Sequence, residues 1–293
     1  MVSLVVATWN RVAELERLLA SLEAQTYKDF ELILVDQNPD DRLVDLIKNH
    51  PGLRVRHLHS QLGVSRARNV GLRAAQGDII AVPDDDCWYP DDLLAAVTQW
   101  FEMHPDTDAL FTGMRTADHK LIAPKWSPGP CFCTKKNVLS CVAAVTAFLR
   151  RKVVATVGFF NENIGPGSGS RYGSGEDLDY FVRPLELGFR LRYEPSLTVF
   201  HPELQSIERL RLKTYAYALG IGFVLRAHGY SWWDLSAALV RSFGGAATSL
   251  CRGDFQRTHM YLLRAAGQLW GYIFGPSDLA KMADSAARAT YTS

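Results

Sequence analysis

The sequence predicts an α/β fold in which a mostly parallel sheet is flanked by helices. Short apolar stretches, typical of buried strands, alternate with stretches of helical periodicity in the first part of the chain. Strands separated by helices of this length form right-handed βαβ crossovers, which produce a parallel sheet. Acidic residues, Asp36 and Asp84-Asp85-Asp86, follow two of the predicted strands. They fall at the sheet edge where open α/β folds bind their ligands.

The predicted elements follow one another at short intervals. Strands are expected where apolar residues run together or alternate, at residues 3–8, 31–35, 54–58 and 79–83. Helices are expected where leucines and other apolar residues recur every three or four positions, around residues 15–22, 43–47 and 66–75. Further on, residues 191–202 have the pattern of two short strands that are broken at Glu194-Pro195.

The composition is that of a globular protein, with 47% hydrophobic and 22% charged residues. A net charge of +1 gives no support for a nucleic-acid partner held by a broad basic field. The five cysteines form no CxxC pair, and Cys131 and Cys133 are too isolated to predict a zinc site. No run of about 18 apolar residues is present, and the first residues lack the pattern of a signal peptide, so we expect a cytoplasmic, reduced protein.

Three consecutive aspartates, Asp84, Asp85 and Asp86, form the most informative motif. They project from the carboxyl end of the predicted strand at residues 79–83. Three carboxylates this close repel one another unless a cation or a hydrogen-bonding ligand compensates them. Mg²⁺ and Mn²⁺ prefer oxygen ligands, often one or two carboxylates together with substrate phosphates. The motif therefore predicts a metal and phosphate site, with a solvated acidic turn before a helix as the alternative.

Four motifs in a fixed order resemble the family 2 glycosyltransferases. They are Ala7–Arg11, Leu34–Asp36, Gly63–Gly71 and Asp84–Asp86. The resemblance continues in Gly173–Tyr180, which is similar to the family's Glu-Asp catalytic motif, and it covers roughly residues 1–202. It implies the GT-A fold, a nucleotide-binding sheet joined to an acceptor-binding half. The glycine fingerprint of dinucleotide oxidoreductases is absent after the first strand, and so is a Walker P-loop.

The resemblance implies a nucleotide-diphosphate sugar as donor, with a UDP-sugar expected, and Mn²⁺ or Mg²⁺ to neutralise the leaving diphosphate. It makes Asp86 the direct metal ligand. Asp84 would contact the ribose or the base region, and Asp85 could take either role. Asp36 corresponds to the residue that hydrogen-bonds the nucleobase, although a strand-end turn cap also explains it.

Arginines near the same edge are further candidates for contact with the donor. Arg66 and Arg68 begin a predicted helix there, and a cation can pair with the diphosphate or the base. Arg66 and Asn69 share one helix face, and solvation at the helix start is the alternative. The residues expected to bind the donor nucleotide are Thr8, Asn10, Arg11, Asp36, Arg66, Asn69, Asp84 and Asp85.

Sugar transfer also needs a base, because the attacking hydroxyl of the acceptor must lose its proton. A glycine-dense segment at residues 165–175 leads into Glu176-Asp177, which opens a helical pattern. A mobile loop ahead of a helix suits closure over a bound donor. By the family match, Asp177 is the expected base and Glu176 positions the acceptor, while ordinary helix capping is the alternative. Asp179 is expected to be a solvated helix residue.

Two further residues are single candidates. His201 ends the second of the strands predicted at 191–202. A neutral imidazole can complete a Mn²⁺ shell, as some GT-A enzymes show, and a structural or phosphate-contacting histidine is the alternative. Trp126 could stack on an acceptor sugar, while a tryptophan packed in its loop is the commoner case.

Residues 204–293 differ from the rest and predict a helical extension to a catalytic domain at residues 1–203. Leucine, alanine, tyrosine and tryptophan recur at helical spacing, with arginines between them. Such amphipathic helices can lie at a membrane interface, on the inner face of the cell membrane. Alternatively, they pack on the catalytic domain or on a second subunit in a homodimer. If they bind a membrane, the acceptor is expected to be lipid-linked, since family members that build bacterial surface polysaccharides commonly use polyprenyl-linked acceptors.

These observations lead to an expected function. The chain would be a metal-dependent, inverting glycosyltransferase that moves one sugar to a saccharide or lipid-linked saccharide acceptor by a single displacement. Other classes stay open. A non-catalytic sugar-nucleotide or glycan-binding module would bind nucleotide without turnover. A nucleotidyltransferase would usually show a glycine- and lysine/arginine-rich loop at Thr8–Arg11. A membrane scaffold would act through residues 204–293 alone.

Overall fold

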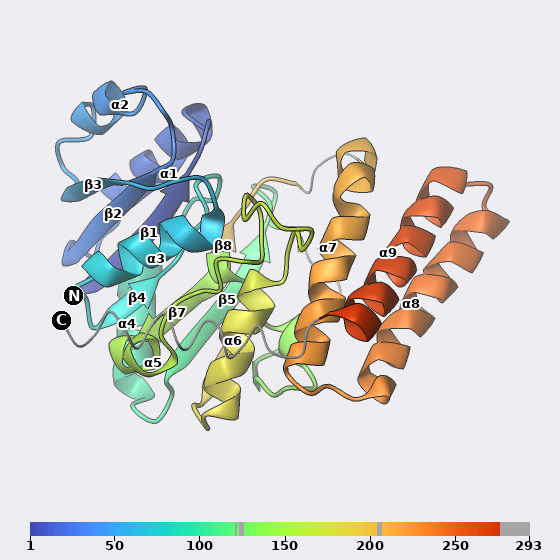
Figure 1. The fold of residues 1–293 in the computed structure, drawn as a ribbon. Coiled ribbons are helices and arrows are strands. Elements are labelled where there is room, and N and C mark those ends of the chain that lie inside the picture. Colours follow the sequence, from blue (N-terminus) through green and yellow to red (C-terminus); the bar gives the residue numbers. More distant parts are fainter. Residues whose placement is uncertain (121, 123–125, 204–206, 276–293) are drawn as a thin grey trace. The chain divides into compact units, whose positions relative to one another are not determined.

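The computed structural model describes residues 1–120, 122, 126–203 and 207–275. These residues form two compact units, and Figure 1 labels most of their helices and strands. The first unit contains Met1–Leu62, Arg66–Phe159 and Phe181–Glu203. The second unit contains Gly63–Ser65, Phe160–Tyr180 and the C-terminal helices. The functional division at residues 203 and 204 stays a prediction.

The first unit is built on one mixed sheet whose strand order is β3-β2-β1-β4-β7-β5-β8-β6. β1 pairs in parallel with β2 and β4, β2 with β3, and β5 with β8. β7 lies antiparallel between β4 and β5, and β6 is antiparallel to β8. The predicted α/β fold with a mostly parallel sheet is confirmed. The strands are β1 Val2–Thr8, β2 Phe30–Asp36, β3 Val55–His59, β4 Ile79–Ala81, β5 Ala109–Arg115, β6 Cys131–Phe132, β7 Ala147–Arg150 and β8 Leu191–Phe200.

Helices alternate with the first strands, as the periodicity of the sequence predicts. Two short 3₁₀ helices, η1 Val138–Ser140 and η2 Ala144–Thr146, precede β7. The α-helices are α1 Ala13–Glu23, α2 Val44–Lys48, α3 Val64–Ala74, α4 Leu93–Met103, α5 Arg151–Val157, α6 Glu176–Glu186, α7 Ile207–Ala227, α8 Trp232–Cys251 and α9 Phe255–Phe274.

The sheet is covered on both faces because its central strands are apolar throughout. Alternate residues of β1 and β2, such as Leu4 and Leu34, pack in one core with the leucine stripe of α1 and with α4. Burial of each leucine side chain stabilises the folded state by about 1.5–3 kcal/mol. On the other face, Gly71 of α3 lies so close to Val5 that an added Cβ would be 2.3 Å from its side chain. This close contact holds α3, which carries most of the Gly63–Gly71 motif, against the sheet.

One sequence prediction in this unit was wrong. Residues 191–200 form the single strand β8, not two strands broken at Glu194-Pro195. Pairing with β5 runs to Glu194 opposite Thr112 and resumes at Thr198 opposite Gly113. Because proline has no N–H to give to a sheet, the intervening residues bulge out of the pairing while the strand continues.

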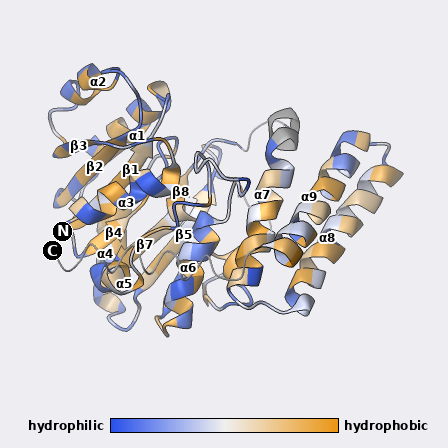
Figure 2. Cartoon of the chain, in the orientation of Figure 1, coloured by the Kyte–Doolittle hydropathy of each residue, from blue (hydrophilic) through white to orange (hydrophobic). Residues whose placement is uncertain are grey.

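The second unit is built around α7, α8 and α9, which confirms a helical C-terminal extension. A capping box of Ser231 and Asp234 begins α8, and the Asp254 side chain caps α9. α7 and α9 approach closely at Gly271, where an added Cβ would lie 2.1 Å from the carbonyl oxygen of Leu219. Figure 2 shows that hydrophobic residues make up much of these helices. None of the helices in the described ranges is long and apolar enough to cross a membrane.

Candidate donor and metal site

The three aspartates lie at the carboxyl end of β4, beside the end of β1, as the sequence predicts. β4 ends at Ala81, but Asp84 still pairs in parallel with Ala7 in an isolated bridge. This bridge brings the triad next to Thr8, which is buried at the last position of β1. The two strand ends therefore form one polar edge.

Arg11 compensates the charge of two of the carboxylates. Its Nη1 donates to Oδ1 of Asp85 at 2.8 Å and also to Asp86. Burial would lower the pKa of Arg11, but the charges of Asp85 and Asp86 outweigh burial and raise it. Arg11 was predicted to contact the nucleotide; the structure places it against the aspartates, and a nucleotide contact stays a prediction.

The two paired aspartates differ in how readily they ionise. Burial raises the pKa of Asp85 to about 6, although Arg11 acts against this. Burial also opposes ionisation of Asp86, but the contact with His201 and the charge of Arg11 outweigh burial, so its pKa is lowered. Asp86 is thus the better anionic ligand near neutral pH.

His201 reaches Asp86 because β8 ends beside the segment that follows the triad. Trp88 and Phe200 exchange two backbone hydrogen bonds of 3.0 and 2.9 Å, and their rings stack. His201, the next residue, has its Nε2 3.2 Å from Oδ1 of Asp86. Burial would lower the pKa of His201, but Asp86 outweighs burial and raises it. The sequence-predicted pair of metal ligands is thus brought together.

Asp84 has a partner, Arg68, that is not among the residues expected to bind the donor nucleotide. Arg68, which is almost fully buried, donates to Oδ1 of Asp84 at 3.0 Å. Arg66, which was expected to bind the donor, donates to the carbonyl oxygen of Leu62 at 3.0 Å. Asn69, also expected to bind the donor, is buried. Both arginines begin the same helix, and their spacing did not show which one faces the aspartates.

The side chains fit a divalent cation. Asp84, Asp86 and His201 each offer one ligand atom, and these atoms all lie within 4.8 Å of one another. Oδ1 of Asp86 is buried and, apart from its ion-pair contact with His201, accepts no hydrogen bond from the described residues. Carboxylates suit Mg²⁺ and Mn²⁺, and the imidazole nitrogen favours Mn²⁺ of the two. A pocket of about 340 Å³ adjoins His201, with Arg17, Trp88 and Asp118 among its lining residues.

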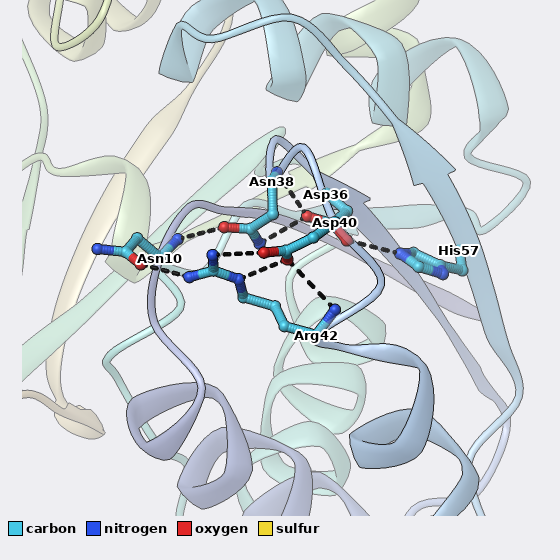
Figure 3. A network of polar contacts seen from close by, with 6 residues as sticks. All are labelled: Asn10, Asp36, Asn38, Asp40, Arg42 and His57. Carbon is cyan, nitrogen blue, oxygen red and sulfur yellow. Dashed lines mark hydrogen bonds and ion pairs between the residues drawn. The ribbon is translucent and has the colours of Figure 1, made fainter.

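Asp36 lies at the end of β2 in a polar network, shown in Figure 3. Its carboxylate accepts hydrogen bonds from Asn38, at 2.8 Å from the backbone N and 2.7 Å from Nδ2, and contacts Nε2 of His57 at 3.1 Å. Asn38 in turn accepts from the backbone N of Asn10 at 2.7 Å. Arg42 joins the network by donating to Asn10. The predicted donor residues Asn10 and Asp36 are therefore held in one network.

Sequence reasoning missed the histidines of this network. His57 and His59 alternate on β3, and their register places them opposite Leu34 and Asp36. With Asp36, they form a second group whose ligand atoms lie within 4.8 Å of one another. The signal was present, because residues two apart on a strand share a face. Asp36 is already engaged by Asn38, and the predicted contact of Asp36 with a nucleobase stays a prediction.

The predicted catalytic residues belong to the second unit. Glu176 begins α6 and is buried, and Gly165, with φ +96°, lies against its carboxylate. Asp177 is half-buried. Asp179 corrects an expectation: it is 3% exposed, not solvated, and Nε2 of His228 lies 3.0 Å from its Oδ1. The partner is 49 residues away, at the end of α7, so helix periodicity alone could not show it.

Trp126, the predicted acceptor residue, packs in the first unit. Its ring meets the ring of Tyr193 edge to face, with centroids 5.8 Å apart. Trp126 is half-buried, so part of its ring surface stays accessible. A sugar contact at Trp126 stays a prediction.

Comparisons with known proteins identify the family of the chain. The sequence profile of Glycosyl transferase family 2 matches residues 3–156, more than half of the chain. An uncharacterized glycosyltransferase of Haemophilus influenzae is 35% identical over 113 residues, which are 38% of either chain. A PGL/p-HBAD biosynthesis glycosyltransferase of Mycobacterium bovis is 31% identical over 173 residues, 55% of this chain and 63% of that protein. The chain therefore matches less than two thirds of the length of these relatives.

Two solved structures share the fold. Staphylococcus aureus TarS 1–349 in complex with UDP-GlcNAc has a TM-score of 0.60 at 14% identity, over 92% of this chain and 90% of that one. The mannosyltransferase PcManGT of Pyrobaculum calidifontis, in complex with GDP-Man and Mn²⁺, has a TM-score of 0.62 at 18% identity, over 92% and 87%. With the profile match and the GT-A fold together, the chain belongs to glycosyl transferase family 2.

Proposed function

We propose that this glycosyltransferase is metal-dependent and inverting, and that it moves a sugar from a nucleotide-diphosphate donor to a saccharide hydroxyl. The carrying observation is the group of Asp84, Asp86 and His201 at the carboxyl edge of the sheet. A buried carboxylate oxygen of Asp86, whose contact among the described residues is with the proposed co-ligand His201, supports a ligand role. Buried polar atoms usually have partners, and a cation held between Asp86 and His201 would satisfy both side chains.

Asp86 and His201 would hold Mn²⁺ or Mg²⁺, with Asp84 beside them. When bound, the ion supplies positive charge where the leaving diphosphate gains negative charge. Arg11 keeps Asp85 and Asp86 close together by offsetting their repulsion. The protein thereby holds the ligands in place before the ion arrives, which lowers the reorganisation needed for binding.

The donor nucleotide would lie along the edge formed by β1, β2 and β4. The network of Asp36, Asn38 and His57 would face the base, and Asn38 keeps the Asp36 carboxylate in one orientation. The TarS complex contains UDP-GlcNAc and the PcManGT complex contains GDP-Man, which supports a sugar nucleotide as the class of donor. A UDP-sugar is the donor we propose, with Thr8, Asn10, Arg66 and Asn69 contributing to its site.

Asp177 would accept the proton of the attacking hydroxyl, and Glu176 would orient the acceptor. In the transfer, the acceptor oxygen forms a bond to the anomeric carbon while the bond to the diphosphate oxygen breaks. The hydroxyl proton passes to the carboxylate of Asp177. One displacement with one base inverts the anomeric centre. Asp177 is half-buried at the start of α6, so the residue is partly accessible to an acceptor, which supports this role.

The helices of the second unit support an acceptor at a lipid surface. α9 exposes Phe255, Leu262, Leu269 and Ile273 at seven- and four-residue spacing, which places them on one stripe. On α8, Trp233 is 84% exposed. Large exposed apolar and aromatic side chains favour a membrane interface. We propose peripheral binding there and a lipid-linked saccharide acceptor; binding to vesicles that Phe255→Ser does not weaken would contradict it.

The test is calorimetric titration with UDP, GDP and dTDP, each with Mn²⁺ and with EDTA. We expect one nucleotide to bind with micromolar affinity in Mn²⁺ and to lose that affinity in EDTA. Asp86→Ala should remove the Mn²⁺ dependence, while Asp91→Ala, an exposed aspartate close in sequence, should not. Unchanged Mn²⁺-dependent affinity in Asp86→Ala would rule out the metal assignment. Nucleotide binding without transfer to any saccharide would favour a non-catalytic binding module.

A further inference from the structure

Three cysteines of the first unit lie together outside the residues assigned above. Cys131 is in β6, Cys133 follows β6, and Cys141 follows η1. The sulfur atoms of Cys131 and Cys141 are 3.6 Å apart and share a hydrogen bond. Cys133 is buried and acts electrostatically on Cys141. The sequence pattern brought only Cys131 and Cys133 to attention, since the third cysteine is eight residues further along the chain.

Backbone hydrogen bonds hold the cysteines in place. Cys131 pairs with Tyr193 of β8, and the N–H of Cys133 donates to the carbonyl of Leu191 at 2.8 Å. Asn137 closes the segment between them by accepting from the N–H of Thr134 at 2.6 Å. A disulfide has an S–S length of about 2.05 Å, so the two sulfurs of Cys131 and Cys141 need to approach by only about 1.5 Å.

The thiols of Cys131 and Cys141 differ in pKa and in exposure to solvent. Hydrogen bonds from Cys133 and Cys131 outweigh burial and lower the pKa of Cys141 to about 7, which favours its thiolate near neutral pH. Burial raises the pKa of Cys131, and its contact with Cys141 adds to this. Cys131 is partly exposed, whereas Cys141 is fully buried. Cys131 is thus the sulfur that a reagent can reach, and Cys141 is the nucleophile beside it.

We propose that Cys131 and Cys141 are a modification site at which a low-molecular-weight disulfide forms an intramolecular disulfide. In the first step, the sulfur of Cys131 attacks the reagent, giving a mixed disulfide and releasing one small thiol with the proton of Cys131. In the second step, the Cys141 thiolate attacks Cys131 sulfur and expels the second small thiolate. The two cysteines lose two electrons, and the reagent disulfide gains them.

A pre-formed metal site is the competing interpretation of three clustered thiols. Among the described residues, the groups whose ligand atoms all lie within 4.8 Å are the two that contain Asp36 or Asp86, and neither contains a cysteine. The arrangement of the three thiols therefore favours a reactive pair, Cys131 and Cys141, with Cys133 beside it, over a zinc site.

The modification would act on the loop that carries Trp126. The N–H of Ser127 donates to the carbonyl of Ser140 at 2.9 Å, next to Cys141. The Oγ of Ser127 is 3.6 Å from the sulfur of Cys131. Ser127 thus contacts Cys131 on one side and Ser140, the neighbour of Cys141, on the other. A disulfide between Cys131 and Cys141 would covalently link these two contact points of Ser127.

The experiment is peptide mapping of the full-length chain after exposure to oxidised glutathione, without reduction. We expect a Cys131–Cys141 link that dithiothreitol reverses, and a glutathione adduct on the exposed Cys251 as an internal control of reactivity. A Cys133–Cys141 link, a stable glutathione adduct on Cys131, or reaction at Cys251 alone would overturn the proposal. The wild-type map decides between these outcomes without any variant.

Variants test the order of the steps. In Cys141→Ser, the glutathione adduct on Cys131 should persist because the resolving nucleophile is gone. In Cys133→Ala, the Cys131–Cys141 link should still form, but more slowly, since Cys141 loses the interaction with Cys133 that favours its thiolate. If Cys141→Ser still formed a disulfide rapidly, between Cys131 and Cys133, this result would contradict the assigned pair.

Discussion

Replacing His228 by alanine should lower the free energy of unfolding by about 3 kcal/mol. The side chains of His228 and Asp179 are 2% and 4% exposed, and Nε2 of His228 lies 3.0 Å from Oδ1 of Asp179. A hydrogen bond to a charged group contributes about 1.5–3 kcal/mol, and removing one partner of a buried pair costs about 3–5 kcal/mol. Because both groups are buried, solvent screening does not reduce this value.

Thermal unfolding followed by circular dichroism, with urea denaturation at 25 °C, measures the change. For a chain of this size, about 3 kcal/mol corresponds to a fall in Tm of roughly 6–12 °C. Asp179→Asn keeps the shape and one hydrogen-bonding oxygen, so it should cost less, about 1 kcal/mol. His259→Ala is the matched control, since His259 is exposed on α9 and should change stability by less than about 0.5 kcal/mol.

An unfolding free energy of His228→Ala within about 0.5 kcal/mol of that of His259→Ala would refute the reasoning. It would mean that the buried contact adds no net stability. A large loss in both variants would point to a general effect of histidine removal instead.

Further predictions concern catalysis and pH. Asp177→Asn should leave nucleotide affinity unchanged and lower turnover by at least about 10²-fold, and near-normal turnover would place the base elsewhere. In metal-free protein, the free energy of unfolding should fall as the pH rises from about 4 to 6, because the pKa of Asp85 is about 6 when folded and 3.8 otherwise. The loss is up to about 3 kcal/mol and should be absent in Asp85→Asn, as urea titrations at several pH values would show. Mn²⁺ affinity should weaken by up to about tenfold for each pH unit below the raised pKa of His201, since a proton competes for its nitrogen. Calorimetry of His201→Gln should show a flatter pH dependence; the same slope in both proteins would exclude His201 as a ligand.

The sequence pattern was sufficient where a feature depended on residues close together along the chain. The apolar run before Asp84 placed the triad at a strand end, and helical spacing found the leucines of α1. The family resemblance supplied His201, whose distance from Asp86 no local pattern could give. β7 lies antiparallel between β4 and β5, and this pairing of distant segments has no signal in either strand alone.

The features that were missed depend on partners far apart in sequence. Asp179 was expected to be a solvated helix residue, but it is buried against His228 at the end of another helix. Cys141 could be connected with Cys131 only after the segment between them was folded. The choice between Arg66 and Arg68 needed the side-chain direction relative to Asp84. In each case, tertiary packing decided what periodicity left open.

The bulge of β8 has a consequence for how the family can vary in length. Pro195, Ser196 and Leu197 lie between the two paired stretches, and three is an odd number, so the bulge exchanges the faces of the sheet to which alternate side chains point. Tyr193 accordingly packs on the face away from the α1 core, whereas Val199 packs in that core with Leu110. A deletion or insertion of a single residue here would make the side chains after the bulge point to the opposite faces of the sheet. His201 would then leave Asp86, so natural length variation in this stretch should occur in steps of two residues.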